Sequence, residues 1–243
     1  MATSKSAKVN KKTPAEWPPA SKGSDALESL RDGNPPNALL AFGRNAIGAG
    51  NHAWAIEYLR RGVEYLRYVV TTFPEVIDTV QVRLDAVTSM LVDAAAAIGD
   101  EATLEFSLPP NPRPEQVAGR AFKLLEAKHS RIAGQWFVRA RQLPMTKKQV
   151  ETHLLRFGVG ELTAQKRAKQ MDSAFVEQLV QVAKAARDAL PPRISDPATR
   201  TAKREIEHVL RAAEKALAAL NEPAPERPKR TATAKKRKAQ ADD

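Results

Sequence analysis

Two histidines follow a glutamate by three residues, a spacing at which a helix places both side chains on one face. The two pairs are Glu126 with His129 and Glu205 with His208. Di-iron carboxylate bundles use this Glu-x-x-His pair together with one further glutamate from each of two other helices. Only Glu57 and Glu64 are loose candidates for those further ligands. Chance pairing on charged helix faces is the simpler interpretation, so we predict neither a metal nor a cofactor.

Other catalytic patterns are weak or absent. The chain has no cysteine, which excludes thiol nucleophiles, disulfides and cysteine zinc sites. Gly43 and Gly48 have the GxxxxG spacing of a phosphate loop, but Ala49-Gly50 follows where Lys-Ser or Lys-Thr is needed. The sequence therefore predicts a protein that is not an enzyme. A catalytic site assembled from distant residues remains an alternative.

Clusters of lysine and arginine are the other candidates, because regularly spaced cations bind the phosphates of a nucleic acid and release counterions. On predicted helices the candidate nucleic-acid-binding cations are Arg120, Lys123, Arg131, Lys147, Lys148, Lys166, Arg167 and Lys169. In the C-terminal tail they are Lys235, Lys236, Arg237 and Lys238. For any single cluster, an ordinary solvated helix face is the competing interpretation.

The distribution of charge favours binding more than any one cluster does. The chain carries 39 basic and 28 acidic residues, a net charge of +11. Residues 25–112 hold six arginines against twelve acidic residues, whereas residues 113–215 hold twenty-one basic against eleven acidic residues. Such asymmetry indicates a polyanion partner for the C-terminal half alone.

A sharper hypothesis concerns residues 147–170. Lys147–Phe157 is predicted as a short helix, Gly158-Val159-Gly160 as a tight turn, and Glu161 as the start of a basic helix. This arrangement is that of a helix-turn-helix unit, whose second helix enters a DNA groove. The second helix would present Gln165, Lys166, Lys169 and Gln170 to base edges, with Arg167 on a phosphate. A generic helical hairpin is the alternative.

Apolar residues recur at three- and four-residue spacing along most of the chain, which predicts amphipathic helices. The expected helices are a pair within 37–70 joined near residues 48–51, then 76–98, 114–143, 147–157, 161–190 and 196–220. The second of the pair is expected to bury Trp54, Tyr58, Val63 and Leu66, and Thr72–Glu75 has the pattern of a capping box. The predicted fold is all-α, a helical bundle of about six or seven helices in two halves.

Four prolines among residues 108–114 prevent a helix from crossing this point, where the composition also changes from acidic to basic. No apolar run approaches the roughly 18 residues of a membrane span, so we expect no integral membrane segment. The predicted organisation is a disordered basic arm at 1–24, an acidic helical subdomain at 25–107, a proline-rich linker at 108–114, a basic helical subdomain at 115–221 and a disordered basic tail at 222–243.

Together these patterns predict a non-enzymatic nucleic-acid-associated protein of the cytoplasm or nucleoid, or of the nucleus in a eukaryotic cell. The basic half and tails are expected to bind the polyanion, with DNA favoured over RNA. The acidic half is expected to mediate self-association or contact with a protein partner. The alternatives are a helical scaffold, such as a phage virion component or a phasin-like granule-coating protein, and an accessory factor or enzyme whose site is not visible in the sequence.

Overall fold

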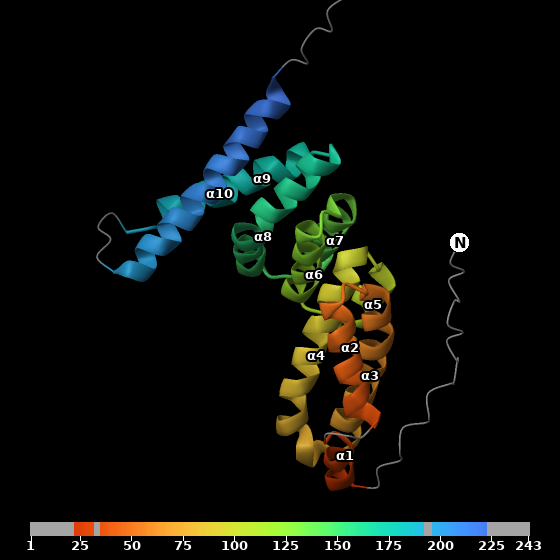
Figure 1. Ribbon diagram of the computed structural model, residues 1–243. Coiled ribbons are helices and arrows are strands. Elements are labelled where there is room, and N and C mark those ends of the chain that lie inside the picture. The colour runs from red at the N-terminus through yellow and green to blue at the C-terminus, as the bar shows by residue number, and fades with distance from the viewer. Residues whose placement is uncertain (1–21, 32–34, 192–195, 223–243) are drawn as a thin grey trace, which may run out of the picture. The chain divides into compact units, whose positions relative to one another are not determined.

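The computed structural model describes residues 22–31, 35–191 and 196–222. Within these ranges all regular secondary structure is helical, which confirms the predicted all-α fold (Figure 1). The described residues form ten α-helices, more than the six or seven expected. Most of the predicted disordered arm and tail, residues 1–21 and 223–243, lies outside the described ranges.

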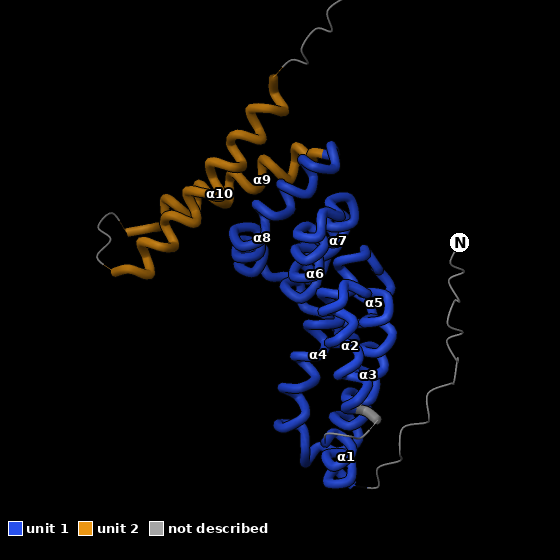
Figure 2. Tube along the Cα trace, viewed as in Figure 1, with its two compact units in different colours: residues 1–170 blue, residues 171–243 orange. Residues whose placement is uncertain are grey.

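The chain divides into two compact units, residues 1–170 and 171–243 (Figure 2). Unit 1 contains α1 (Gly23–Ser29), α2 (Pro35–Gly48), α3 (His52–Thr72), the 3-10 turn η1 (Pro74–Val76), α4 (Ile77–Ile98), α5 (Glu101–Phe106), α6 (Pro114–Glu126), α7 (Ser130–Gln142) and α8 (Lys147–Ala168). Unit 2 contains α9 (Ser173–Asp188) and α10 (Pro197–Asn221), which pack against each other.

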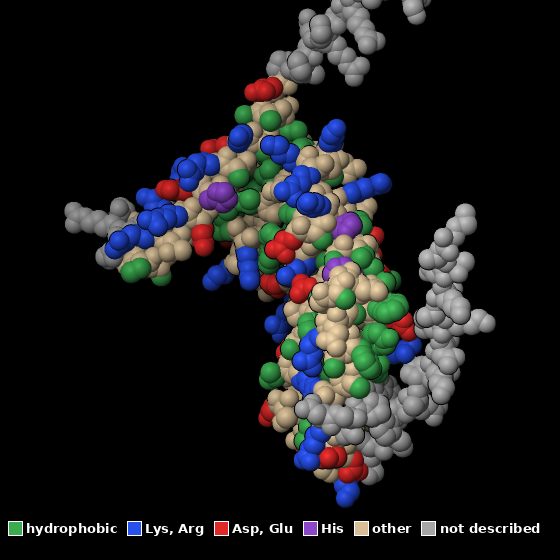
Figure 3. All heavy atoms as spheres, in the orientation of Figure 1, with side chains coloured by type: hydrophobic (Ala, Val, Ile, Leu, Met, Phe, Trp, Pro, Cys, Tyr) green, Lys and Arg blue, Asp and Glu red, His purple; other side chains and the backbone are tan. Residues whose placement is uncertain are grey.

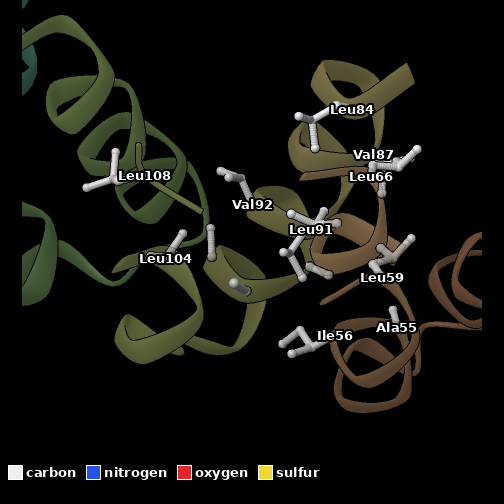
Figure 4. Packing of buried hydrophobic residues seen from close by; sticks show 14 of the residues in the cluster. Ala55, Ile56, Leu59, Leu66, Leu84, Val87, Leu91, Val92, Leu104 and Leu108 are labelled. Carbon is white, nitrogen blue, oxygen red and sulfur yellow. The ribbon is translucent and has the colours of Figure 1, made fainter. Parts of the chain in front are cut away.

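One hydrophobic core runs through unit 1. Leu59 and Leu66 of α3 pack with Leu91 of α4, and the same cluster continues through Leu104 and Leu108 (Figure 4). It extends onwards into α6, α7 and α8. No helix crosses the prolines of residues 108–114, as predicted, and α5, which the sequence analysis did not predict, ends just before them. They lie inside unit 1, however, because the apolar faces on both sides of the break share this core.

Two expected long helices are interrupted. The helix predicted over 114–143 ends at Glu126, and α7 starts at Ser130 after Lys128 with φ 70°. The helix predicted over 161–190 ends at Ala168, where Lys169 takes φ 56°, and Asp172 caps the start of α9 through a hydrogen bond from the Phe175 N–H. The residue that takes a left-handed conformation at the end of a helix is usually glycine. Because lysine takes it at both positions, the sequence gives no signal of these two breaks.

Two local predictions in the N-terminal half are wrong. Thr72 belongs to α3 and forms no capping box. Glu75 instead accepts a hydrogen bond from the Gly23 N–H at 3.1 Å. Trp54, predicted to be buried, is 53% exposed, although Val63 and Leu66 are buried as expected. The spacing of apolar residues correctly located α3. It did not show which apolar side chains around the circumference of this helix are buried in the core.

No helix among the described residues is both long enough and apolar enough to cross a membrane.

Candidate functional site

Helix α8 carries the main group of candidate cations. It begins at Thr146, whose side chain accepts from the Gln149 N–H at 3.3 Å while the Gln149 side chain accepts from the Thr146 N–H at 2.8 Å. These two reciprocal hydrogen bonds form a capping box. The predicted turn at residues 158–160 is wrong, because α8 runs through both glycines as one helix. The helix-turn-helix arrangement is therefore absent at these residues.

Gly160 has a packing role that accounts for this error. A Cβ at this position would lie 2.5 Å from Cζ of Phe122 and 3.1 Å from Cζ of Phe137. The ring of Phe122 contacts those of Phe137 and Phe157, with centroids 5.2 and 5.7 Å apart. The missing side chain thus admits an aromatic ring of α6 against the α8 backbone, and the glycine marks a close helix contact.

The outward face of α8 is positively charged. Lys148, Arg156, Lys166 and Arg167 are all exposed. At 3.6 residues per turn they fall within about 100° of arc, and Lys148 lies about 27 Å from Lys166 along the axis. Neither acidic residue of α8 shares this arc. Figure 3 shows Lys and Arg side chains at the surface of this region. Within the described chain, none of the four cations forms an ion pair with a carboxylate.

Arg156 was missed by the sequence analysis because it stands alone, eight residues from the nearest predicted cluster. Its guanidinium lies over the ring of Phe157, 5.1 Å from the centroid. Only the continuity of α8 places it between Lys148 and Lys166. The signal available in the sequence was the shared helical face, which the assumed turn at residues 158–160 concealed.

Gln165 does not face solvent. It is 5% exposed, and its Nε2 donates to Oε1 of Glu161 at 3.1 Å. The predicted contact with a base edge is therefore wrong for this residue. Lys147 at the start of α8 and Lys169 at its C-cap are both exposed. They lie about 33 Å apart along the axis at a rise of ~1.5 Å per residue. Arg167 additionally donates to the Leu125 carbonyl at 3.5 Å.

The candidate cations outside α8 have other surroundings. Arg120 is half-buried and donates to Ser107. Lys123 forms ion pairs with Asp93 at 3.0 Å and Glu126 at 3.6 Å, and its hydrogen bond to Asp93 raises the pKa of the ammonium group. Arg131 is exposed on α7. Lys235, Lys236, Arg237 and Lys238 lie outside the described residues.

The two Glu-x-x-His pairs do not build a metal site. Glu126 ends α6, whereas His129 precedes α7 beyond the break and directs Nε2 at the Ala97 carbonyl, 3.3 Å away. Glu205 and His208 are exposed on α10. Across the described ranges, no group of three or more His, Asp or Glu side chains is placed to hold a metal ion.

A buried polar network lies beneath the cationic face of α8. Glu161 is 2% exposed, and its Oε1 accepts from Nη2 of Arg141 at 3.0 Å and from Nε at 3.1 Å. Gln165 donates to the same oxygen. A buried carboxylate needs such partners, because its desolvation is otherwise too costly. The network therefore joins α7 to α8 and fixes which face of α8 points outward.

His153 lies on the buried face of α8. It is 3% exposed, its ring centroid is 4.9 Å from that of Phe157, and neither ring nitrogen has a hydrogen-bond partner among the described residues. Burial holds the pKa of His153 below its ordinary value of 6.5. The charge of Glu115 opposes this effect, and that of Arg141 adds to it. The folded protein therefore favours the neutral imidazole.

We expect His153 to make the protein less stable in mild acid. Below pH 6.5 the unfolded chain protonates this imidazole more readily than the folded chain does. Its stability contribution is thus complete above that pH and declines as the pH falls. His153→Leu should flatten the decline in Tm between about pH 7.5 and about pH 5.5, the range in which histidine titrates, as measured by circular dichroism. His208→Leu, at an exposed position of α10, should leave the decline unchanged. Equal declines in wild type and His153→Leu would contradict this account.

A comparison of the chain with family models, curated proteins and solved structures finds no significant match.

Proposed function

We propose that the chain is a non-enzymatic protein that binds duplex DNA through the outward face of α8. The observation that supports this is the row formed by Lys148, Arg156, Lys166 and Arg167. All four cations are exposed on one side of a continuous helix, and no described carboxylate pairs with them. Cations already paired with carboxylates gain little from a phosphate, whereas unpaired ones gain through counterion release.

The geometry favours a duplex over a single strand. The row is straight and about 27 Å long, given the rise of an α-helix. The duplex backbone presents a charge every ~1.7 Å of axis, so phosphates are available to each cation along a straight path. With Gln165 buried, α8 offers few groups that distinguish bases. The proposed binding is therefore mainly to the backbone and largely independent of base sequence.

The aromatic surface of the acidic half supports a second candidate, a helical scaffold that associates with itself or with another protein. Phe42 is 55% and Trp54 53% exposed, and the ring of Phe42 packs against Tyr58 with centroids 5.8 Å apart. Figure 3 shows hydrophobic side chains at the surface on the α2–α3 side of unit 1. Exposed apolar clusters of this kind are typical of protein contact sites.

Fluorescence anisotropy with a duplex of about 20 base pairs, titrated with salt, tests the proposed function. The variant combines Lys148→Gln, Arg156→Gln and Lys166→Gln. Its affinity at low salt should fall at least about tenfold. The slope of log K against log salt should decrease by about three, one for each phosphate that the variant no longer neutralises.

The control combines Arg31→Gln, Arg60→Gln and Arg61→Gln. It removes the same net charge from arginines that pair with Glu28, Glu64 and Glu57. Its affinity should stay within about twofold of wild type, because these arginines already pair with carboxylates and gain little from a phosphate. Equal losses in the two triple variants would overturn the proposed role of α8. A wild-type protein that sediments as an oligomer and binds no duplex at low salt would favour the scaffold instead.

A further inference from the structure

Unit 1 contains a cavity of about 970 Å³, and no residue of α8 lines it. Residues of α3, α4, α5, α6, α7 and the proline-rich segment line it. Leu84, Val92 and Phe106 provide apolar wall, and Arg67 and Arg120 are among its charged groups. Its volume lies at the upper end of the ~300–1,000 Å³ typical of small-molecule sites.

Arg67 and Arg120 approach each other at this cavity. Arg67 donates from Nη2 to the Leu108 carbonyl at 3.4 Å, and Arg120 donates from Nε and Nη2 to Oγ and the carbonyl of Ser107, both at 3.2 Å. Both guanidinium groups are half-buried. Burial lowers the pKa of Arg120, and the charge of Arg67 lowers it further, as expected for neighbouring cations.

No carboxylate among the described residues forms an ion pair with either of these two arginines. Glu105, which also lines the cavity, makes a bidentate ion pair with an arginine of α7. Asp85 accepts from Nε2 of Gln81 at 2.8 Å. The charge of Glu64 acts on the α3 arginine of the pair, but its carboxylate pairs with Arg60 at 3.5 Å. Two half-buried like charges without an ion pair are electrostatically unfavourable, and a bound anion would relieve the repulsion.

The arginines also have a structural role, since they donate to the carbonyls of Ser107 and Leu108, the two residues that follow α5, but that role leaves donors free. A guanidinium has five N–H groups. Arg67 uses one of them, toward Leu108. Arg120 uses three, counting the 3.5 Å contact of Nη1 with the Gln116 carbonyl. The remaining N–H groups, four on Arg67 and two on Arg120, have no acceptor among the described residues.

We propose that this cavity binds a small phosphorylated ligand, whose phosphate is held between Arg67 and Arg120. Guanidinium groups match phosphate through paired N–H donors, and two of them neutralise a dianion. The cavity is much larger than a phosphate group. The apolar wall formed by Leu84, Val92 and Phe106 accommodates the rest of the ligand. This inference does not depend on DNA binding by α8.

Arg60 provides a matched control for Arg67. The guanidinium carbon of Arg60 lies 4.5 Å from the centroid of the Phe106 ring, and that of Arg67 lies 4.7 Å from it. Only Arg67 lines the cavity. Substituting either arginine removes one positive charge and one contact with the same ring. A difference between the two variants therefore reports on the cavity and not on overall charge.

Isothermal titration calorimetry with inorganic pyrophosphate tests the site. Wild type should bind one pyrophosphate saturably, Arg67→Gln should bind at least about tenfold more weakly, and Arg60→Gln should stay within about twofold, in line with the strength of charge-assisted contacts to phosphate. If Arg67→Gln does not fold, Arg67→Lys replaces it. This variant keeps the charge but loses the planar fork, and should bind at least about threefold more weakly. Absence of saturable binding, or equal weakening by the Arg60 and Arg67 substitutions, would overturn the proposal.

Two further arms identify the source of the phosphate. One titrates adenosine monophosphate, and the other compares an oligonucleotide bearing a 5′-phosphate with the same oligonucleotide bearing a 5′-hydroxyl. Binding of the mononucleotide that Arg67→Gln weakens supports a small-molecule ligand. Extra affinity from the 5′-phosphate alone, abolished by Arg67→Gln, would overturn that assignment and place a nucleic-acid end in the cavity. The triple α8 variant should bind pyrophosphate like wild type, which separates this site from the proposed DNA surface.

Discussion

Glu161→Ala is expected to lower the free energy of unfolding by about 3 kcal/mol, near the lower end of the cost of breaking a buried ion pair. The substitution leaves Arg141 and Gln165 without the carboxylate oxygen to which both donate. The cost stays near the lower end because the Arg141 side chain is 22% exposed and regains some hydration. Urea unfolding followed by helical circular dichroism measures the loss.

Glu151→Ala serves as the control. Glu151 also lies on α8, but it is half-buried and pairs with none of the described basic residues. Its removal should change the free energy of unfolding by no more than about 0.5 kcal/mol, as is usual for substitutions away from networks. If Glu161→Ala cost no more than Glu151→Ala, the network would not be what fixes α8 against α7.

Gly160→Ala is expected to destabilise the protein by about 2 kcal/mol, a typical cost of overpacking a core. The added methyl group would overlap the ring of Phe122, which is already in contact with the rings of Phe137 and Phe157. The effect should appear as a lower urea midpoint with an unchanged slope, because the surface exposed on unfolding stays nearly the same.

Gly134→Ala makes the same chemical change in α7, where nothing lies within 4 Å of the added Cβ. It should stabilise the protein by about 0.5–1 kcal/mol, because alanine is a better helix former than glycine. The two substitutions thus have opposite expected signs. Stabilisation by Gly160→Ala would show that the aromatic rings adjust freely and that α8 is not held by this close approach.

The sequence predicted the helical fold because hydrophobic periodicity is a strong local signal. The helix predicted over 76–98 is α4, which starts at Ile77, and the helix predicted over 196–220 is α10, which starts at Pro197. Breaks without glycine or proline were missed. Lys128 and Lys169 end their helices in a left-handed conformation that neither their type nor their neighbours indicate. Conversely, the glycines at 158 and 160 suggested a turn where tertiary packing uses Gly160 inside a helix.

The candidate site was predicted only in part, because charge is visible in a sequence and pairing is not. Lys148 and Lys166 are exposed without ion pairs, as the hypothesis requires. Lys123 pairs with Asp93, thirty positions away in the sequence. Arg120 contacts Ser107 across the proline-rich segment. These partners depend on the packing of α4 and α5 against α6, and no local pattern contains that information.

The uninterrupted course of α8 also restricts how this region can change in length. Inserting one residue between Arg156 and Lys166 would rotate Lys166 by about 100° relative to Lys148 while moving it only ~1.5 Å along the axis. An insertion between Glu161 and Gln165 would also rotate one of these two residues by the same angle and take it out of the buried network. A change of about seven residues, two full turns, preserves the helical phase. Length variation in α8 should therefore be tolerated in steps of whole turns, and the spacing of its cations should vary in the same discrete steps.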